Sequence, residues 1–415
     1  MYRDHTVGVV IPAYNEEGFI GDVIREMPEY VDRMYVVDDC STDGTWTEVI
    51  EAARTDREAL GLDEPAEKGR IAVTDGGESL ADRAICHNMI GRVVPIKHKQ
   101  NLGAGGAIKT GYLAAREEEM DVTATVDGDG QMDLSQMKKL LNPIVEGNAD
   151  YAKGNRLLYK EYRKEMPKFR FLGNSILTFL TKIASGYWKT MDPQNGYTAI
   201  SGYALNNVGI ETMYEYYGYC NDLLVKLNTK GMRVADVAMP AVYGNEASSI
   251  QYSTYIRKVS AMLLQNFLWR LKMKYLMLDF HPLALFYLFG AAMAGLGLLG
   301  GGWSLFAKVV LGDPLFVRAT SSLLLFSVGS MFIMFAMLFD MQVNESQEVQ
   351  DESRIWRLYS QSSTLLMSIY SGTLFRNSRK RDTKSLYTRV TRTSRSNFSR
   401  LMTLTTLYLL VMLTP

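Results

Sequence analysis

The sequence predicts an α/β protein with a mostly parallel, doubly wound sheet, followed by a pair of membrane-spanning helices. From Thr6 to about Met239, short β-branched runs alternate with helical patterns, which is typical of a parallel sheet with helices on both faces. Two long and almost uncharged apolar stretches follow. Together these observations predict a globular domain joined to a membrane hairpin.

Five apolar runs have the length and composition of strands. They are separated by amphipathic helical patterns and cover residues 6–12, 34–39, 92–98, 122–129 and 150–155. Residues Gly61 to Gly91, between the second and third runs, are rich in Gly, Asp and Glu. We expect this stretch to be a surface insertion and assign it no function.

Polar residues follow four of the predicted strands. In open α/β sheets, ligands bind beyond the carboxyl ends of the strands. We therefore expect four strand ends to meet at one crevice that contains Asn15, Glu16, Asp38, Asp39, Asn101, Asp127 and Asp129.

The two apolar stretches are long enough to cross a bilayer. Leu283 to Leu311 contains only Lys308 as a charge, and Leu315 to Met341 contains only Arg318 and Asp340. The alternative, two buried helices of a soluble all-α domain, seldom combines this length with so few charges. Basic residues flank the pair on both sides and predict a cytoplasmic catalytic part; they are Arg270, Lys272, Lys274, Arg354 and Arg357.

The segments on either side of the hairpin are basic. Between Ser253 and Phe280, apolar residues recur every three or four positions and alternate with cations, which predicts amphipathic helix at the membrane surface. From Gln342 onward the chain has 11 Lys/Arg against 5 Asp/Glu. This tail is compatible with contact to anionic lipid and equally with disorder.

Cysteine and histidine usage excludes some classes of site. The three cysteines are scattered without a Cys-x-x-Cys pair, so neither a disulfide framework nor a zinc site is indicated. The four histidines lack metal-ligand spacing. The N-terminus does not have the pattern of a signal peptide, so we expect the chain to begin inside the folded domain.

Asp127-Gly128-Asp129 places two carboxylates at the end of a buried strand. Hard divalent cations prefer oxygen ligands, and a diphosphate leaving group needs its charge neutralised. The alternative is a loop of turn residues, because Asp and Gly are both common in turns.

Four motifs occur in order along the chain: PAYNEE at 12–17, VVDDCSTDGT at 36–45, QNLGAGGA at 100–107 and VDGDGQ at 126–131. Together they resemble the motifs of the family-two glycosyltransferases, which have the GT-A, Rossmann-like fold. Extended through the hairpin, the resemblance is to archaeal-type polyprenyl (dolichyl) phosphate sugar synthases.

The resemblance implies a nucleotide-sugar site with a Mn²⁺ or Mg²⁺ ion. Pro12, Tyr14 and Glu16 would line the nucleoside pocket, and Asp39 would read the base edge. Asp127, Asp129 and Gln131 would serve the metal and diphosphate, with Asn101, Gly103 and Lys109 also on the donor side. Asp38 has an equal structural alternative as a turn carboxylate.

The glycines at 103–106 have two possible roles. They can place a helix N-terminus near the donor, where backbone N–H groups favour anions, or they can allow a helix to pack closely on the sheet. A nucleotide-triphosphatase loop is excluded because Ile108, not glycine, precedes Lys109.

The acceptor side is predicted from Asp192, Arg156 and a basic stretch. Asp192 in MDPQNGY stands where related enzymes carry a catalytic carboxylate, and Arg156 suits phosphate or diphosphate oxygens, with a surface salt bridge as its alternative. A phosphate acceptor is already anionic at pH 7, so Asp192 would position it more than deprotonate it. Cations for the acceptor would come from residues 160–170, including Arg163, and from Arg257 and Lys258, with only one or two acting as ligands.

The resemblance thus implies inverting transfer of a sugar, from UDP-glucose or UDP-N-acetylglucosamine, to a polyprenyl or dolichyl phosphate for glycan or protein glycosylation. The expected partners are this donor, the lipid phosphate and the bilayer of a prokaryotic cell membrane, and no nucleic acid. We expect a catalytic domain at 1–245, interfacial helices at 246–282, the hairpin at 283–341 and a cytoplasmic tail at 342–415.

Two other functions fit part of the pattern. A polysaccharide synthase acting on a sugar acceptor shares the motifs, but QNFLWR at 265–270 misorders its Gln-x-x-Arg-Trp signature. A catalytically inactive membrane scaffold would not need the carboxylates that are all present.

Overall fold

The computed structural model describes residues 1–62, 80–157, 168–240, 252–312 and 314–349. The chain divides into two compact units, residues 1–351 and 352–415, and the described residues all belong to the first. The basic tail expected at 342–415 therefore lies outside the described residues from position 350 onward.

A nine-stranded mixed sheet, in the order β3-β4-β2-β1-β5-β7-β6-β8-β9, forms the centre of the catalytic part. Five of its eight pairings are parallel, which confirms the expected mostly parallel sheet. All five predicted strands are present, as β1, β2, β4, β5 and β6. The strands are β1 Val7–Ala13, β2 Arg33–Asp38, β3 Ala84–Cys86, β4 Val93–His98, β5 Val122–Thr125, β6 Tyr151–Asn155, β7 Thr198–Ser201, β8 Val234–Ala238 and β9 Glu348–Val349.

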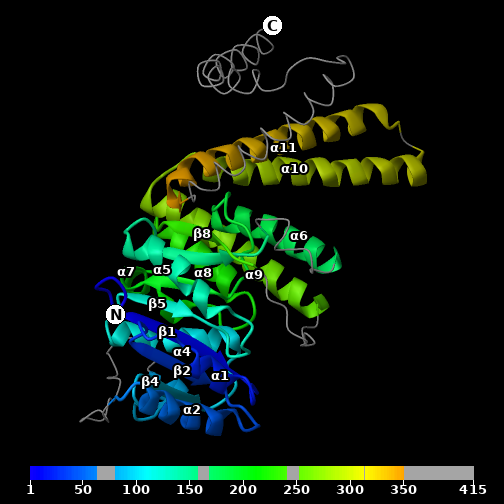
Figure 1. The fold of residues 1–415 in the computed structure, drawn as a ribbon. Coiled ribbons are helices and arrows are strands. Elements are labelled where there is room, and N and C mark those ends of the chain that lie inside the picture. The colour runs from blue at the N-terminus through cyan, green and yellow to red at the C-terminus, as the bar shows by residue number, and fades with distance from the viewer. Residues whose placement is uncertain (63–79, 158–167, 241–251, 313, 350–415) are drawn as a thin grey trace, which may run out of the picture. The chain divides into compact units, whose positions relative to one another are not determined.

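Helices cover both faces of this sheet (Figure 1). Alternate residues of β1 show the two layers: Val9 and Ile11 join one hydrophobic cluster, and Val10 joins the other. The first cluster includes residues of α1, α2 and α5, and the second includes residues of α4, α7 and α8. The helices of the catalytic part are α1 Ile20–Arg25, α2 Thr45–Ala59, α3 Leu80–Arg83, α4 Ala104–Glu117, α5 Met137–Val145, α6 Lys168–Ser185, α7 Gly202–Asn207 and α8 Tyr219–Thr229, with short 3₁₀ turns at Leu134–Gln136 and Ile210–Thr212.

The part of Gly61 to Gly91 that the structure describes from Leu80 onward is not the expected surface insertion. It contains α3 and β3, and β3 pairs antiparallel with β4 at the edge of the sheet. Leu80 and Ala84 lie in the hydrophobic core. Residues 84–86 therefore complete the sheet, although their run is too short to predict as a strand.

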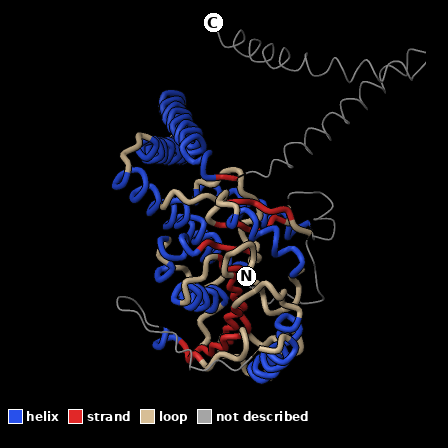
Figure 2. Tube along the Cα trace, turned by 60° about the vertical axis from the view of Figure 1, so that its left-hand side comes forward, coloured by secondary structure: helices blue, strands red, loops and turns tan. Residues whose placement is uncertain are grey.

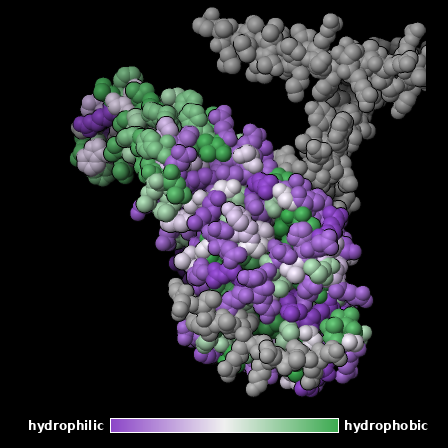
Figure 3. All heavy atoms as spheres, turned by 90° about the vertical axis from the view of Figure 1, so that its left-hand side faces the viewer, coloured by the Kyte–Doolittle hydropathy of each residue, from purple (hydrophilic) through white to green (hydrophobic). Residues whose placement is uncertain are grey.

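Two long apolar helices follow the catalytic part, as predicted. They are α10 (Leu283–Phe306, continued by a π-helical turn at Ala307–Leu311) and α11 (Phe316–Asn344). Residues 283–311 and 316–347 are long and apolar enough to cross a membrane. A Cβ on Gly329 would lie 2.3 Å from the backbone nitrogen of Ala294, so the pair packs through small residues. In Figure 3 the surface of these helices is largely hydrophobic, whereas the sheet domain in the same view is mostly hydrophilic.

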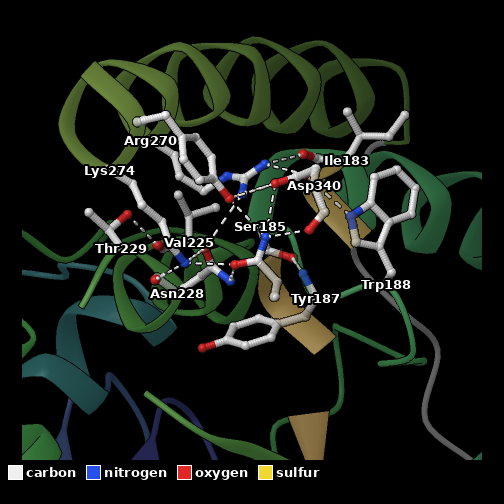
Figure 4. Close-up of polar contacts among 12 residues, drawn as sticks. Ile183, Ser185, Tyr187, Trp188, Val225, Asn228, Thr229, Arg270, Lys274 and Asp340 are labelled. Atoms are coloured by element: carbon white, nitrogen blue, oxygen red, sulfur yellow. Dashed lines mark hydrogen bonds and ion pairs between the residues drawn. The ribbon is translucent and has the colours of Figure 1, made fainter. Parts of the chain in front are cut away.

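The helix before the hairpin, α9 (Tyr252–Lys272), joins the catalytic part to α11 and runs into a π-helical segment at Met273–Leu278. Arg257 and Lys258 are exposed, as expected of an amphipathic surface helix. Arg270 is not: its side chain is 0% exposed and forms a two-pronged ion pair with Asp340 of α11, at 2.9 and 2.8 Å (Figure 4). Interpreting Arg270 as a basic residue of the membrane surface is therefore wrong.

Lys274 is also an internal residue. Its ammonium donates to the side chain of Asn344 at 2.6 Å and to the carbonyl of Asn228 at 2.8 Å. Burial, together with the charge of Arg270, lowers the pKa of Lys274 to about 7. Two of the three basic residues counted ahead of the hairpin thus bind the hairpin to the catalytic domain.

After α11, the chain returns to the catalytic sheet. A short 3₁₀ turn at Glu345–Gln347 leads into β9, which pairs parallel with β8. The tube in Figure 2 shows this strand, in red, directly after the helical hairpin. The sheet is therefore completed only by residues that follow both candidate membrane spans.

Candidate active site at the carboxyl ends of the strands

Four parallel strands, β4, β2, β1 and β5, lie side by side, and the predicted site residues follow their carboxyl ends. Backbone hydrogen bonds join these ends. The Asp39 N–H donates to Ala13, and the Gly128 N–H donates to Pro12. The expected convergence of four strand ends is present.

The loop after β1 is fastened to the loop after β2. Asn15 adopts φ +57°, and its side-chain oxygen accepts from the Thr42 N–H at 2.9 Å. The Glu16 N–H donates to the Thr45 hydroxyl at 2.8 Å. Tyr14, between the strand and these contacts, is 48% exposed. An exposed aromatic ring on a fixed backbone is suited to stacking on a planar base.

Asp39 is almost entirely buried and organises the loop after β4. Its carboxylate accepts from the N–H groups of Leu102 and Gly103, each at 2.8 Å. His98 Nδ1 lies 2.6 Å from the same carboxylate, and Asn101 donates to the Asp39 carbonyl at 3.3 Å. Asp39, Asn101 and Gly103 therefore form one connected unit.

Asp38 fits its structural alternative. The side chain is fully buried, and one oxygen accepts from the Ser41 N–H at 3.0 Å, which forms a local turn. Lys97 lies 3.6 Å from the other oxygen. Asp38 thus shapes the turn in which Asp39 sits.

Lys109 is not at the strand ends. Lys109 belongs to α4, and its side chain is buried. Its ammonium lies 2.8 Å from the carboxylate of Glu215, which Arg83 also contacts. The glycines of this helix allow close packing: a Cβ on Gly111 would lie 2.3 Å from Val10. The Gly106 N–H is bonded to the Glu215 carbonyl. Both observations favour helix packing over anion binding as the role of this motif.

Asp127 and Asp129 occupy the turn that leaves β5. Both are partly buried, Asp129 accepts from the Gln131 N–H at 2.9 Å, and Gly130 adopts φ +71°. Burial and the neighbouring charge of Asp129 raise the pKa of Asp127 to about 7, although Arg156 opposes this shift. The charge of each of these two carboxylates disfavours ionisation of the other, and a divalent cation would relieve their repulsion.

Arg156 and Asp192 form a two-pronged ion pair near these carboxylates. Arg156 Nε donates to Asp192 Oδ2 at 2.8 Å, and Nη2 donates to Oδ1 at 3.0 Å. Asp192 is 1% exposed, whereas Arg156 remains 30% exposed. Burial alone would raise the pKa of Asp192, but the hydrogen bonds and charge of Arg156 hold it below its usual value.

The remaining acceptor-side residues lie apart or outside the described chain. Arg163 falls within 158–167 and lies outside the described residues. Arg257 and Lys258 are exposed on α9, and the Lys258 ammonium lies 5.7 Å from the centre of the Tyr216 ring. Tyr216 in turn lies beside Gly103, close to where the Gly103 Cβ would be. This contact links α9 to the donor-side loop.

Some residues near the site gave no signal in the sequence. Lys153 of β6 is buried, pairs with Asp236 at 2.9 Å and donates to the Asp192 carbonyl at 3.1 Å. A Cβ on Gly196 would lie 3.3 Å from Asp127 and 3.4 Å from the Tyr219 hydroxyl. A lysine within a short strand and a tyrosine in a helix have no distinctive pattern of their own.

Among the residues described, no group of three or more His, Cys, Asp or Glu is arranged to hold a metal ion. Asp127 and Asp129 are two carboxylates only. Their hard oxygen atoms and mutual repulsion fit a divalent cation whose other ligands come from a bound diphosphate or water.

The sheet domain matches a protein-family model and is similar in sequence to known proteins. The family model described as glycosyl transferase family 2 matches residues 8–67 and 58–209. The UDP-N-acetylglucosamine–dolichyl-phosphate N-acetylglucosaminyltransferase of Methanococcus voltae is 29% identical over 241 residues, which are 58% of this chain and 87% of that protein. An uncharacterized protein of Methanocaldococcus jannaschii is 27% identical over 236 residues, 57% of this chain and 81% of the relative.

Two solved structures are also similar to this chain, both at low sequence identity. Glucosyl-3-phosphoglycerate synthase from Mycobacterium tuberculosis, in complex with UDP, has a TM-score of 0.41 and 18% identity, over 64% of this chain and 80% of that one. A mannosyltransferase from Pyrobaculum calidifontis, in complex with GDP-mannose and Mn²⁺, has a TM-score of 0.36 and 14% identity, over 80% and 87% of the two chains.

Proposed function

The chain carries a glycosyl transferase family 2 domain, and from this premise we propose that it transfers a sugar from a UDP-linked donor to a polyprenyl phosphate. The assignment of a lipid acceptor rests on one observation. The Arg270–Asp340 ion pair joins this domain to the apolar hairpin. The named function of the Methanococcus voltae relative supports the same donor and acceptor classes.

The donor binds across the ends of β1, β2 and β4 in this proposal. Tyr14 stacks on the base, with Pro12 and Glu16 beside it, and Asp39 reads the base edge through the remaining acceptor capacity of its carboxylate. Asn101 and Gly103 shape the facing wall because Asp39 holds their loop. Lys109 is left out of this donor site because its ammonium is paired with Glu215.

Asp127 and Asp129, with Gln131, would hold the Mn²⁺ or Mg²⁺ ion that serves the donor diphosphate. Such an ion neutralises the charge that develops on the leaving diphosphate. The two carboxylates must be ionised to bind it, so binding displaces the proton that the raised pKa of Asp127 retains near pH 7.

Arg156 and Asp192 orient the acceptor. A phosphate monoester is largely anionic at pH 7 and needs no strong base. The low pKa of Asp192 makes it a poor proton acceptor, which supports a positioning role. Its carboxylate holds the Arg156 guanidinium, and the Arg156 side chain, 30% exposed, would contact a phosphate oxygen of the acceptor.

The reaction is a single in-line displacement. An oxygen of the lipid phosphate attacks C1 of the sugar, the bond from C1 to the nucleoside diphosphate breaks, and the anomeric configuration inverts. The diphosphate leaves with the bonding electron pair. No covalent enzyme intermediate forms.

The hairpin brings the acceptor to this site. The helices α10 and α11 enter the bilayer, with the catalytic domain on the cytoplasmic side, and the exposed Arg257 and Lys258 of α9 face anionic headgroups. A lipid phosphate at the bilayer surface then meets the acceptor side of the site.

Partition of a labelled product tests the acceptor class. Membranes containing the chain are incubated with UDP-[¹⁴C]N-acetylglucosamine, Mn²⁺ and either a polyprenyl phosphate or the matching polyprenol without phosphate. We expect label in the organic phase only with the phosphate, and release of the sugar by mild acid. Label in water-soluble polymer would instead indicate a sugar acceptor, and no transfer to any acceptor would indicate a scaffold.

A further inference from the structure

The segment that leaves the second apolar helix contacts the loop that carries Asp192. Glu348 of β9 is only 9% exposed. Its carboxylate accepts from the backbone N–H groups of Trp188 at 2.9 Å, Lys189 at 2.6 Å and Thr190 at 2.9 Å. Three consecutive amides of one loop are thus held by one side chain from beyond the hairpin.

The next amide of the loop is held from the catalytic sheet. The Met191 N–H donates to Asp236 Oδ2 at 2.7 Å, and Lys153, paired with Asp236, donates to the Asp192 carbonyl at 3.1 Å. Every backbone N–H from residue 188 to residue 191 therefore donates a hydrogen bond to a carboxylate. Two acidic residues on neighbouring strands fix the approach to Asp192.

Asp192 itself needs this support. Its φ of +48° lies in the left-handed region, which is uncommon for residues other than glycine although Asp adopts it more readily than most, so contacts from the surroundings help to hold it there. The bidentate contact with Arg156 also requires one orientation of the carboxylate. A loop that relaxed at 188–190 would release both constraints.

The same segment is fixed to α11 by further contacts. Trp188 Nε1 donates to Asp340 Oδ2 at 3.3 Å, where Asp340 already pairs with Arg270 (Figure 4). Asn344, one turn further along α11, donates to the Asp340 carbonyl at 2.7 Å. The loop is consequently joined both to the last turns of α11 and to the strand that follows them.

We propose that Glu348 is a positioning residue for Asp192, so that the end of the second membrane helix sets the geometry of the acceptor side. The inference rests on the proposed function for its catalytic consequence, but the contact itself is independent of any activity. A carboxylate is required because three N–H donors meet two acceptor oxygens. Glutamine at this position offers one acceptor oxygen and turns an NH₂ group toward donors.

The test compares Glu348→Gln with Glu345→Gln in the full chain, reconstituted in lipid nanodiscs. Glu345 is a matched control because it lies three residues earlier and contacts the exposed Lys189 ammonium rather than the loop backbone. We expect hydrogen exchange of the amides at 188–190 to speed up at least tenfold in Glu348→Gln, and to stay unchanged in Glu345→Gln. Peptides of β1 serve as the reference for global unfolding.

Kinetics provide the second readout. In Glu348→Gln we expect kcat for transfer to polyprenyl phosphate to fall by about 10- to 100-fold, with the Kd for UDP changed less than twofold, because the donor site lies on other strands. Glu348→Asp, which keeps both acceptor oxygens on a shorter side chain, is expected between the native chain and Glu348→Gln in both measurements.

Unchanged exchange at 188–190, or faster exchange with an unaltered kcat, would overturn the positioning inference. A parallel loss of UDP affinity would also overturn it, because the effect would then be general. A native chain that makes no lipid-linked sugar contradicts the proposed function instead, and the exchange measurement then decides the Glu348 contact by itself.

Discussion

Asp192 receives both arms of the Arg156 guanidinium, from Nε at 2.8 Å and from Nη2 at 3.0 Å. One partner of this pair is buried, and the other keeps nearly a third of its side chain exposed. The pair therefore has an inner carboxylate that orients and an outer cation that can contact a ligand. This division suits an acceptor that is already an anion.

Replacing Arg156 by lysine should separate the effect of its positive charge from the effect of its two parallel hydrogen bonds to Asp192. Lysine keeps the positive charge but cannot form two parallel hydrogen bonds, so we expect kcat/KM for the lipid phosphate to fall by about 10- to 100-fold. Steady-state transfer assays measure this loss. Arg233→Lys is the control, because Arg233 contacts Asp150 with one nitrogen at the surface; an equal loss in both variants would contradict the assignment.

Metal affinity should depend on pH through Asp127. Its pKa of about 7 means that protons compete with the cation below neutral pH. We expect the apparent Kd for Mn²⁺ to rise by up to about tenfold per pH unit as the pH falls below about 7. Isothermal titration with Mn²⁺ and UDP between pH 5.5 and 8.5 measures it, and a pH-independent Kd would exclude Asp127 as a ligand.

The same shift predicts a stability change in the metal-free chain. Because the folded pKa of Asp127 is above the usual value of 3.8, the folded chain holds the extra proton, and stability falls as the pH rises from about 4 to 7. Asp127→Asn should therefore gain on the order of 2 kcal/mol at pH 8 with chelator present, and little at pH 4. Thermal melting at the two pH values in detergent checks this. A variant that is less stable at pH 8 would contradict the burial argument.

Asp39→Asn should weaken donor binding. The carboxylate accepts from two backbone N–H groups, and an asparagine amide would direct N–H toward at least one of them. We expect the loop at 98–103 to shift and the Kd for UDP to rise at least tenfold, by equilibrium binding. Asp38→Asn serves as the comparison, since the Asp38 carboxylate contacts Ser41 and Lys97.

The Arg270–Asp340 pair should respond differently to single and double substitution. Removing one partner leaves a buried charge unpaired, so Arg270→Met or Asp340→Leu alone should cost about 3–5 kcal/mol. The double variant should recover most of that loss, because two apolar side chains can occupy the site. Thermal unfolding in detergent measures the cycle; additive losses would show that the two residues are not coupled. The exposed Arg3–Glu146 pair is the control, with an expected effect below about 1 kcal/mol.

The parts of the fold that were predictable from the sequence are those with a local pattern. The strands β1, β2, β4, β5 and β6 have β-branched runs, and α10 and α11 have length and apolarity. The strands β3 and β9 have three and two residues, so only their pairing partners define them. Arg270 illustrates the same limit: a basic residue at helical spacing looks solvated until a helix 70 residues later supplies Asp340.

The candidate site likewise contains residues that local motifs predict and residues that only tertiary contacts bring together. Motifs of consecutive residues predicted the positions of five residues at the strand ends, namely Asp39, Asn101, Gly103, Asp127 and Asp129. The bond between Arg156 and Asp192, by contrast, joins positions 36 residues apart. The role of Glu348 comes from further away still, because a strand after the hairpin brings its carboxylate to the loop at 188–190. Such contacts depend on tertiary packing, which no window of sequence contains.

The most direct test of the central claim is sugar transfer by the native chain and by two variants of one loop. Membranes are supplied with polyprenyl phosphate, Mn²⁺ and labelled UDP-N-acetylglucosamine, UDP-glucose or GDP-mannose in separate reactions. The variants are Asp129→Ala and Asp133→Ala, the latter removing an exposed carboxylate four residues away. We expect lipid-linked label from a UDP-sugar with the native chain and Asp133→Ala, and at least a 100-fold loss with Asp129→Ala or with chelator. Full transfer by Asp129→Ala, or transfer that persists without divalent metal, would contradict the account.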